Sequence, residues 1–128
     1  MKDQVLTIEQ VKFLKELGVE FKDTLLYWIH DKQFSVEDFL CTREMCGIYI
    51  KEPHKFEITP TPTLQELLEM MPQNIEWHTL LVSKNATAYQ NVGWSTMKVF
   101  CNEGILINSY NMLCWLAENK LLGKEEKK

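Results

Sequence analysis

The last predicted helix, residues 105–122, constrains the fold more than any other segment, because apolar side chains surround most of it. At 100° per residue, one broad apolar stripe runs along this helix. Its members are Leu106, Tyr110, Leu113, Ala117 and Leu121, flanked by Ile105, Met112 and Leu116 on one side and Ile107 and Cys114 on the other. The polar remainder holds Asn108, Asn111 and Glu118, with Trp115 and Leu122 in its middle. Such a helix is covered on nearly every side, or its Trp115 edge meets a partner.

Composition predicts one soluble globular domain in residues 1–123, followed by a charged tail in residues 124–128. With 128 residues, 45% of them hydrophobic and 25% charged, the chain is long enough for a real core. The formal net charge of -4 gives no reason to expect nucleic acid as a partner. Since no apolar run reaches the roughly 18 residues that span a bilayer, and no signal-peptide core follows Met1, we expect a cytoplasmic protein without a membrane partner.

The first helix has a clear beginning and a clear end. Thr7 and Gln10 form a capping box, and Leu6 and Val11 form a hydrophobic staple around it. Gly18 stands where a left-handed residue ends a helix. We therefore predict a helix from the residue after Thr7 to the residues just before Gly18.

The middle of the chain reads as strands and one further capped helix. Residues 24–29 and 46–51 are predicted strands, 56–58 is a short extended piece, and a helix runs from Thr63 to Pro72. Residues 33–41 are compatible with a short helix, a loop or an edge strand, and we favour the short helix or loop. Residues 77–84, 87–91 and 95–101 are β-prone runs joined by tight turns, which favours an antiparallel meander. The resulting expectation is an α+β fold, with an antiparallel or mixed sheet of about four to five strands packed against two or three helices.

The residue types that bind metals or act as nucleophiles show no diagnostic spacing. The cysteines are Cys41, Cys46, Cys101 and Cys114, and the histidines are His30, His54 and His78. Because structural zinc uses closely spaced ligand pairs, we predict no metal and no cofactor. In a reducing compartment the cysteines are expected to be free thiols. Cys101, just before the last helix, is the one position suited to a low-pKa nucleophile, although no histidine is placed beside it by the sequence.

The aromatic residues give the better clue to function. Four tryptophans, Trp28, Trp77, Trp94 and Trp115, are many for a chain of this size, and exposed tryptophan is a favoured anchor in protein interfaces. We predict a contact edge made by Trp115, Leu122 and Asn111. The alternative is a pocket built from Trp94, Tyr89 and Cys101.

Three segments of the chain carry a resemblance. They are Leu6–Gln10 continuing to Leu17–Val19, Pro62–Leu68, and Tyr110–Trp115. Together they resemble small uncharacterised proteins encoded in bacterial prophages and related mobile elements. The resemblance implies an accessory gene product and brings no activity, cofactor or catalytic residue.

The leading expectation from the sequence is a non-enzymatic interaction module that assembles with itself or with another protein. The alternative is a small enzyme or ligand-binding domain with its site near Cys101 and Trp94.

Overall fold

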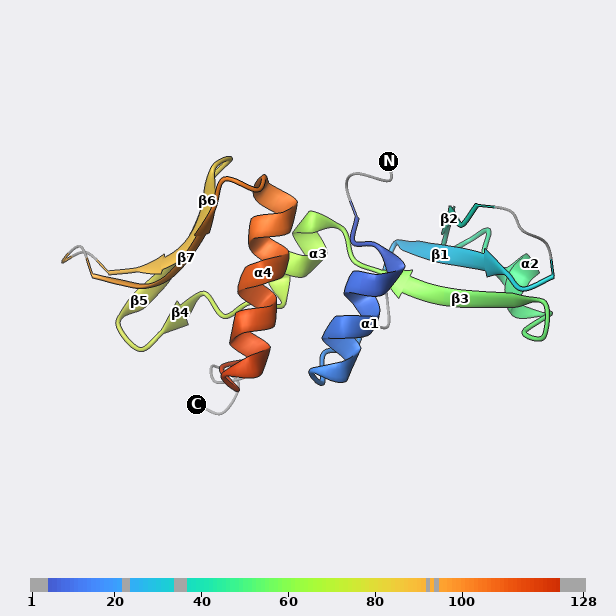
Figure 1. Ribbon diagram of the computed structural model, residues 1–128, viewed down its shortest axis with the longest axis horizontal. Coiled ribbons are helices and arrows are strands. Elements are labelled where there is room, and N and C mark those ends of the chain that lie inside the picture. The colour runs from blue at the N-terminus through green and yellow to red at the C-terminus, as the bar shows by residue number, and fades with distance from the viewer. Residues whose placement is uncertain (1–4, 22–23, 34–36, 92, 94, 123–128) are drawn as a thin grey trace. The chain divides into compact units, whose positions relative to one another are not determined.

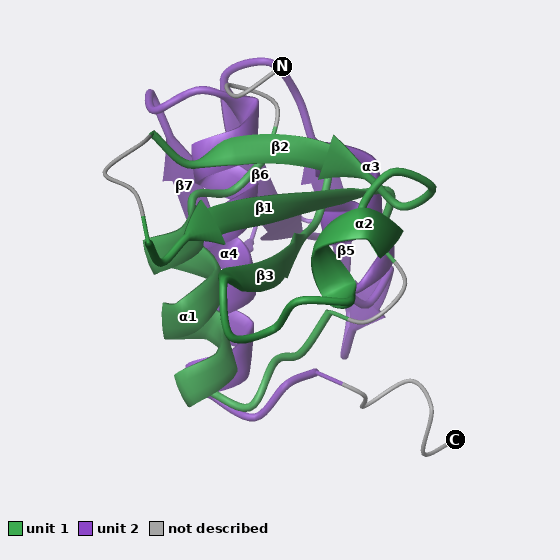
Figure 2. Ribbon diagram, turned by 90° about the vertical axis from the view of Figure 1, so that its right-hand side faces the viewer, with its two compact units in different colours: residues 1–63 green, residues 64–128 purple. Residues whose placement is uncertain are grey.

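The computed structural model describes residues 5–21, 24–33, 37–91, 93 and 95–122. It forms two compact units, residues 1–63 and 64–128 (Figure 2). The predicted α+β class is confirmed, but the strands belong to two antiparallel sheets of three and four strands (Figure 1). The prediction of one domain in residues 1–123 stays a prediction, and the charged tail lies outside the described residues.

The first unit is a three-stranded sheet with a helix associated with each face. Its elements are α1 (Ile8–Glu16), β1 (Leu26–Asp31), β2 (Phe39–Thr42), α2 (Gly47–Ile50) and β3 (Phe56–Thr61). The strand order is β2-β1-β3, and every neighbouring pair is antiparallel. Ile29, Cys41 and Cys46 form a buried cluster with the aromatic residues beside α2. Val5, Leu26 and Trp28 form a second cluster, against which Ile8 of α1 packs.

Both ends of α1 follow the sequence signals. The Thr7 side chain accepts a hydrogen bond from the Gln10 backbone N–H at 3.2 Å, and the Gln10 side chain accepts one from the Thr7 N–H at 2.8 Å. At the other end Gly18 has a φ of 92°, and the Val19 N–H donates to the Leu14 carbonyl at 2.9 Å. These bonds satisfy helix-terminal groups that would otherwise lack partners.

The prediction of a strand over residues 46–51 is wrong, because residues 47–50 form the short helix α2. Tyr49 explains the difference. Its ring packs edge-on against Phe39 at a centroid distance of 5.5 Å and against Phe56 at 4.9 Å. Tertiary packing therefore overrides the β-propensity of the Ile-Tyr-Ile run. The short helix or loop favoured for residues 33–41 is wrong from Phe39 onward, because Phe39 begins the strand β2, which pairs with β1. Residues 34–36 lie outside the described part of the chain.

The second unit is a four-stranded meander with helices on one face. Its elements are α3 (Leu64–Glu69), β4 (Asn74–Ile75), β5 (His78–Val82), β6 (Ala86–Gln90), β7 (Thr96–Cys101) and α4 (Ile105–Glu118). The strand order β4-β5-β6-β7 confirms the predicted antiparallel meander of the last three strands. Figure 1 shows α3 and α4 on the same side of this sheet.

The helix α4 ends four residues earlier than predicted. Lys120 adopts a left-handed conformation with φ 56°, and the Leu121 N–H donates to the Leu116 carbonyl at 2.8 Å. The Lys120 N–H bonds the Ala117 carbonyl, which completes the same type of terminus that Gly18 gives to α1. Because a lysine occupies the left-handed position, the glycine that usually marks such a helix end is missing here.

Candidate functional site

The residues of β5, β6 and β7 divide between two faces of the sheet. Thr87 of β6 faces α4, since its hydroxyl lies 3.1 Å from the Ser109 hydroxyl of that helix. Tyr89 lies on the same face, and its hydroxyl donates to the Pro72 carbonyl at 2.8 Å. Side chains alternate along a strand, and directly paired residues share a face. The remaining residues of β6 therefore point away from α4.

We call the surface that points away from α4 the outer face. By strand register it holds Thr79, Leu81, Ala86, Ala88, Gln90, Thr96, Val99 and Cys101. Its centre is a cross-strand row in which Leu81 pairs with Ala88 and Ala88 pairs with Val99. Leu81 is 50% exposed and Val99 45% exposed, whereas Ala88 is buried between them. No helix among the described elements of the second unit covers this row (Figure 1).

The outer face carries no charge on any of its described residues. Lys98 is the charged residue of β7, and it pairs with Tyr89 on the opposite face. There its ammonium lies 5.0 Å from the centre of the Phe100 ring. The described positions of this face are thus all uncharged, although 25% of the chain is charged.

Asn108 belongs to the core, so the prediction that it lies on the polar side of the last helix is wrong. The residue is fully buried, and its amide donates to the Asn85 carbonyl at 3.3 Å while its carbonyl oxygen accepts from the Glu103 N–H at 3.3 Å. The side chain thus links α4 to the β5–β6 turn. The helical pattern could not reveal this, because Asn85 lies 23 residues earlier in the chain.

The predicted contact edge is only partly accessible. Trp115 and Asn111 lie on α4 and are both half-buried. Leu122 is also half-buried, but it follows the end of the helix and therefore does not continue the helical row that was predicted. This edge stays a prediction, with less exposed apolar surface than the outer face offers.

The alternative pocket is not assembled by the described residues. Tyr89 faces α4 and is fully buried, whereas Cys101 is exposed on the outer face. These two side chains lie on opposite sides of the sheet, so they do not line one cavity. Trp94 lies outside the described residues. Selective alkylation of Cys101 would accordingly report its exposure and would not identify a nucleophile.

Two of the buried thiols are poorly suited to nucleophilic chemistry. Burial, together with the neighbouring Cys46 thiol, raises the pKa of Cys41. Burial raises the pKa of Cys114, and Glu118 adds to the effect. Burial and the hydrogen bond with Cys114 also raise the pKa of Tyr110. Since the thiolate is the reactive form, these cysteines behave as small apolar core residues.

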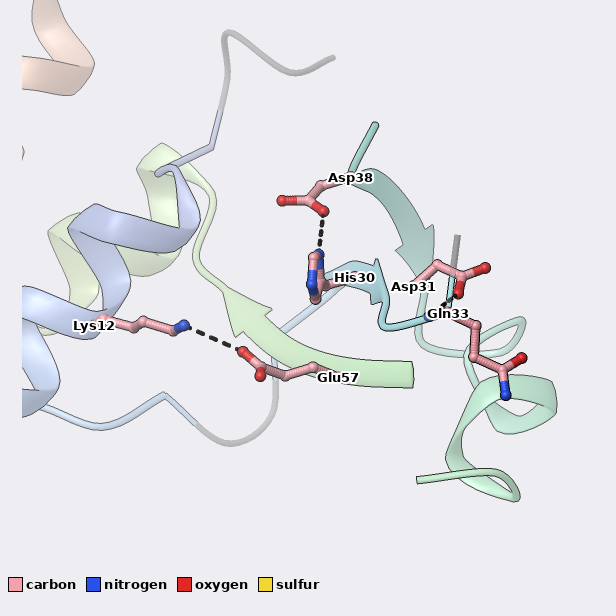
Figure 3. Close-up of polar contacts among 6 residues, drawn as sticks. All are labelled: Lys12, His30, Asp31, Gln33, Asp38 and Glu57. Carbon is pink, nitrogen blue, oxygen red and sulfur yellow. Dashed lines mark hydrogen bonds and ion pairs between the residues drawn. The ribbon is translucent and has the colours of Figure 1, made fainter. Parts of the chain in front are cut away.

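A row of polar and charged side chains crosses one face of the first unit (Figure 3). His30 Nδ1 lies 2.8 Å from Asp38 Oδ1, and Lys12 Nζ lies 3.2 Å from Glu57 Oε1. His30 and Glu57 are directly paired across β1 and β3. A histidine held by a carboxylate can serve as a general base, but the His30 and Asp38 side chains are 48% and 38% exposed. The two pairs are therefore best described as surface contacts of small energetic value.

A cleft of about 400 Å³ lies between α1 and β3 in the same unit. Its apolar lining includes Val11, Val19 and Phe21, and Lys12 stands at its rim. Lys12 is already paired with Glu57, which also lines the cleft. Ligand sites combine apolar walls with a few polar groups, and Lys15, Glu20 and Thr59 add polar groups to the lining of this cleft.

Trp77 is the most exposed large apolar residue of the described chain, and it lies just before β5, the strand that was predicted over residues 77–84. It stands 87% exposed in the two-residue turn between β4 and β5, next to Glu76, whose φ is 57°. Nothing in the local sequence marks this tryptophan as more exposed than Trp28 or Trp115.

Comparison with protein families, with curated proteins and with solved structures finds no match to this chain. The resemblance to prophage proteins therefore stays a prediction. Among the described residues, no group of three histidine, cysteine or acidic side chains could hold a metal ion. No helix in the described part of the chain is long and apolar enough to cross a membrane.

Proposed function

We propose that this chain is a non-enzymatic protein-interaction module whose contact surface is the outer face of β5–β7. The observation that supports the proposal is the uncharged row in which the exposed Leu81 and Val99 flank the buried Ala88. Interfaces have uncharged apolar centres more often than the rest of a protein surface does. A cytoplasmic location and an accessory role in a mobile element belong to the same proposal.

The alternative is a small enzyme or ligand-binding domain. We favour the interaction module, because the described residues do not assemble a catalytic group. His30 and Asp38 form an exposed pair without a third member. Tyr89 and Cys101 are on opposite faces of their sheet. The outer face, by contrast, needs no further group to act as a binding surface.

Photochemical cross-linking from Cys101 tests the proposal. Cys101 is exposed at the end of β7, whereas Cys41, Cys46 and Cys114 are buried, so a benzophenone maleimide will label Cys101 first. Irradiation of the labelled chain in an extract of the cells that produce it is expected to give discrete protein adducts. Gel mobility and mass spectrometry of the adducts are the readout.

Three variants give this experiment its controls. Leu81→Asp places a charge in the row and is expected to abolish the adducts, while Leu25→Asp changes a 59% exposed leucine outside the outer face and is expected to keep them. Trp115→Ala tests the edge on α4. Adducts that survive Leu81→Asp, or that disappear only in Trp115→Ala, would contradict the proposed surface.

A further inference from the structure

We infer that the cleft between α1 and β3 binds a small apolar zwitterion of the α-amino acid class, with its carboxylate on Lys15 and its ammonium group on Glu20. This inference goes beyond the proposed function, because the cleft belongs to the first unit and the outer face belongs to the second. The volume of the cleft, about 400 Å³, lies within the range of about 300–1,000 Å³ that small-molecule sites occupy.

The apolar wall of the cleft is formed where the chain leaves α1. Gly18 has a φ of 92°, and the Val19 N–H donates to the Leu14 carbonyl at 2.9 Å. This hydrogen-bonded turn fixes the direction of the chain, so that Val19 and Phe21 line the cleft together with Val11 of α1. The wall is therefore in place before a ligand arrives, which lowers the entropy cost of binding.

One ion pair joins the two elements that border the cleft. Lys12 Nζ of α1 lies 3.2 Å from Glu57 Oε1 of β3 (Figure 3). Thr59 is two residues further along β3 and therefore lies on the same face of the strand as Glu57. Because Lys12 and Glu57 neutralise each other, a ligand does not have to supply a charge for either of them.

Lys15 and Glu20 are the other two charged residues of the lining, and they select the class of ligand. Both are exposed, and neither forms an ion pair with another residue of the described chain. They lie on either side of Gly18, before and after the same turn. A ligand with only a negative or only a positive charge would bring a like charge to one of them. A zwitterion is complementary to both, and the apolar wall accepts its side chain.

The exposure of the two charged groups limits the affinity. Ion pairs between exposed groups contribute little free energy, so the charges mainly orient the ligand while the apolar wall contacts its side chain. A dissociation constant of about 1 mM is therefore expected.

Nuclear magnetic resonance titration of the isotope-labelled full chain with L-leucine and with L-phenylalanine tests the inference. At least one of the two amino acids is expected to shift the amide signals of residues 11–21 and 57–60 in a saturable way. Three probes each lack one part of the proposed ligand: glycine lacks the apolar side chain, 4-methylpentanoate the ammonium group, and 3-methylbutylamine the carboxylate. Each is expected to bind at least about 10-fold more weakly than the amino acid that binds.

Matched variants separate the two charged contacts from an effect of overall charge. Lys15→Gln and Glu20→Gln are each expected to weaken binding about 10-fold. Glu16→Gln and Lys51→Gln change exposed residues outside the lining of the cleft and are expected to leave the dissociation constant unchanged. All four positions are exposed, so the variants are expected to stay folded, and the dispersion of their amide signals verifies this.

Three results would overturn the inference. They are the absence of saturable shifts with both amino acids, binding of 4-methylpentanoate or 3-methylbutylamine as tight as that of the amino acid, and unchanged binding in Lys15→Gln or Glu20→Gln. None of them bears on the outer face, which the Cys101 cross-linking tests separately.

Discussion

Replacing Trp28 by alanine is expected to lower the free energy of unfolding by about 3–5 kcal/mol, as removal of a buried aromatic side chain commonly does. Trp28 is 7% exposed and lies in the buried cluster with Val5 and Leu26. Its indole N–H also donates to the Leu6 carbonyl at 2.7 Å, which ties the segment before α1 to the sheet. Folded domains are stable by only about 5–15 kcal/mol, so this variant should be close to unfolding at room temperature.

Chemical denaturation followed by circular dichroism measures this loss of unfolding free energy. Two further variants separate the contribution of apolar burial from that of the indole hydrogen bond. Trp28→Phe keeps most of the apolar area and loses the donor, for an expected cost of about 1 kcal/mol, since Thr61 still donates to the Leu6 carbonyl at 2.8 Å. Trp77→Ala removes the 87% exposed tryptophan and should change stability by less than about 0.5 kcal/mol. Equal effects of Trp28→Ala and Trp77→Ala would refute the burial of Trp28.

Ile29→Ala is expected to cost about 2–5 kcal/mol through the cavity it leaves on the α2 side of the first sheet. Ile29 is fully buried beside Cys41 and Cys46, among the aromatic side chains of Phe39, Tyr49 and Phe56. The matched control is Ile48→Ala, which truncates a 68% exposed isoleucine of α2 and should cost less than about 0.5 kcal/mol. Denaturation midpoints of the two variants give the comparison, and a difference below 1 kcal/mol would show that this cluster is not a packed core.

An element was predicted correctly where the residues that define its ends lie within a few positions of one another in the sequence. The capping box at Thr7 and Gln10 and the stop at Gly18 define α1 because each is a local hydrogen-bonding device. The end of α4 was missed for the converse reason, since Lys120 takes a conformation in which glycine is the usual residue. The helix α2 was missed because its fold depends on Phe39 and Phe56, which are distant in sequence.

The outer face could not be predicted from hydrophobic alternation. Leu80, Leu81 and Val82 are consecutive apolar residues of β5, and Val99 and Phe100 adjoin in β7, so both faces of these strands read as apolar. The register of β5 and β7 with β6 decides which of their side chains point towards α4, because Thr87 of β6 contacts Ser109 of that helix. A one-residue shift in register would exchange the two faces, and sequence periodicity alone does not determine that choice.

The contact surface can be mapped most directly by nuclear magnetic resonance of the isotope-labelled chain, alone and with the protein that the Cys101 cross-linking identifies. If the outer face is the contact surface, the amide shifts that change on addition of that protein will lie in β5, β6 and β7. The largest changes are expected around Leu81, Ala88 and Val99, with small changes in the first unit. Changes confined to the Trp115 edge, to the charged row of His30 and Glu57, or to the cleft beside α1 would contradict the account.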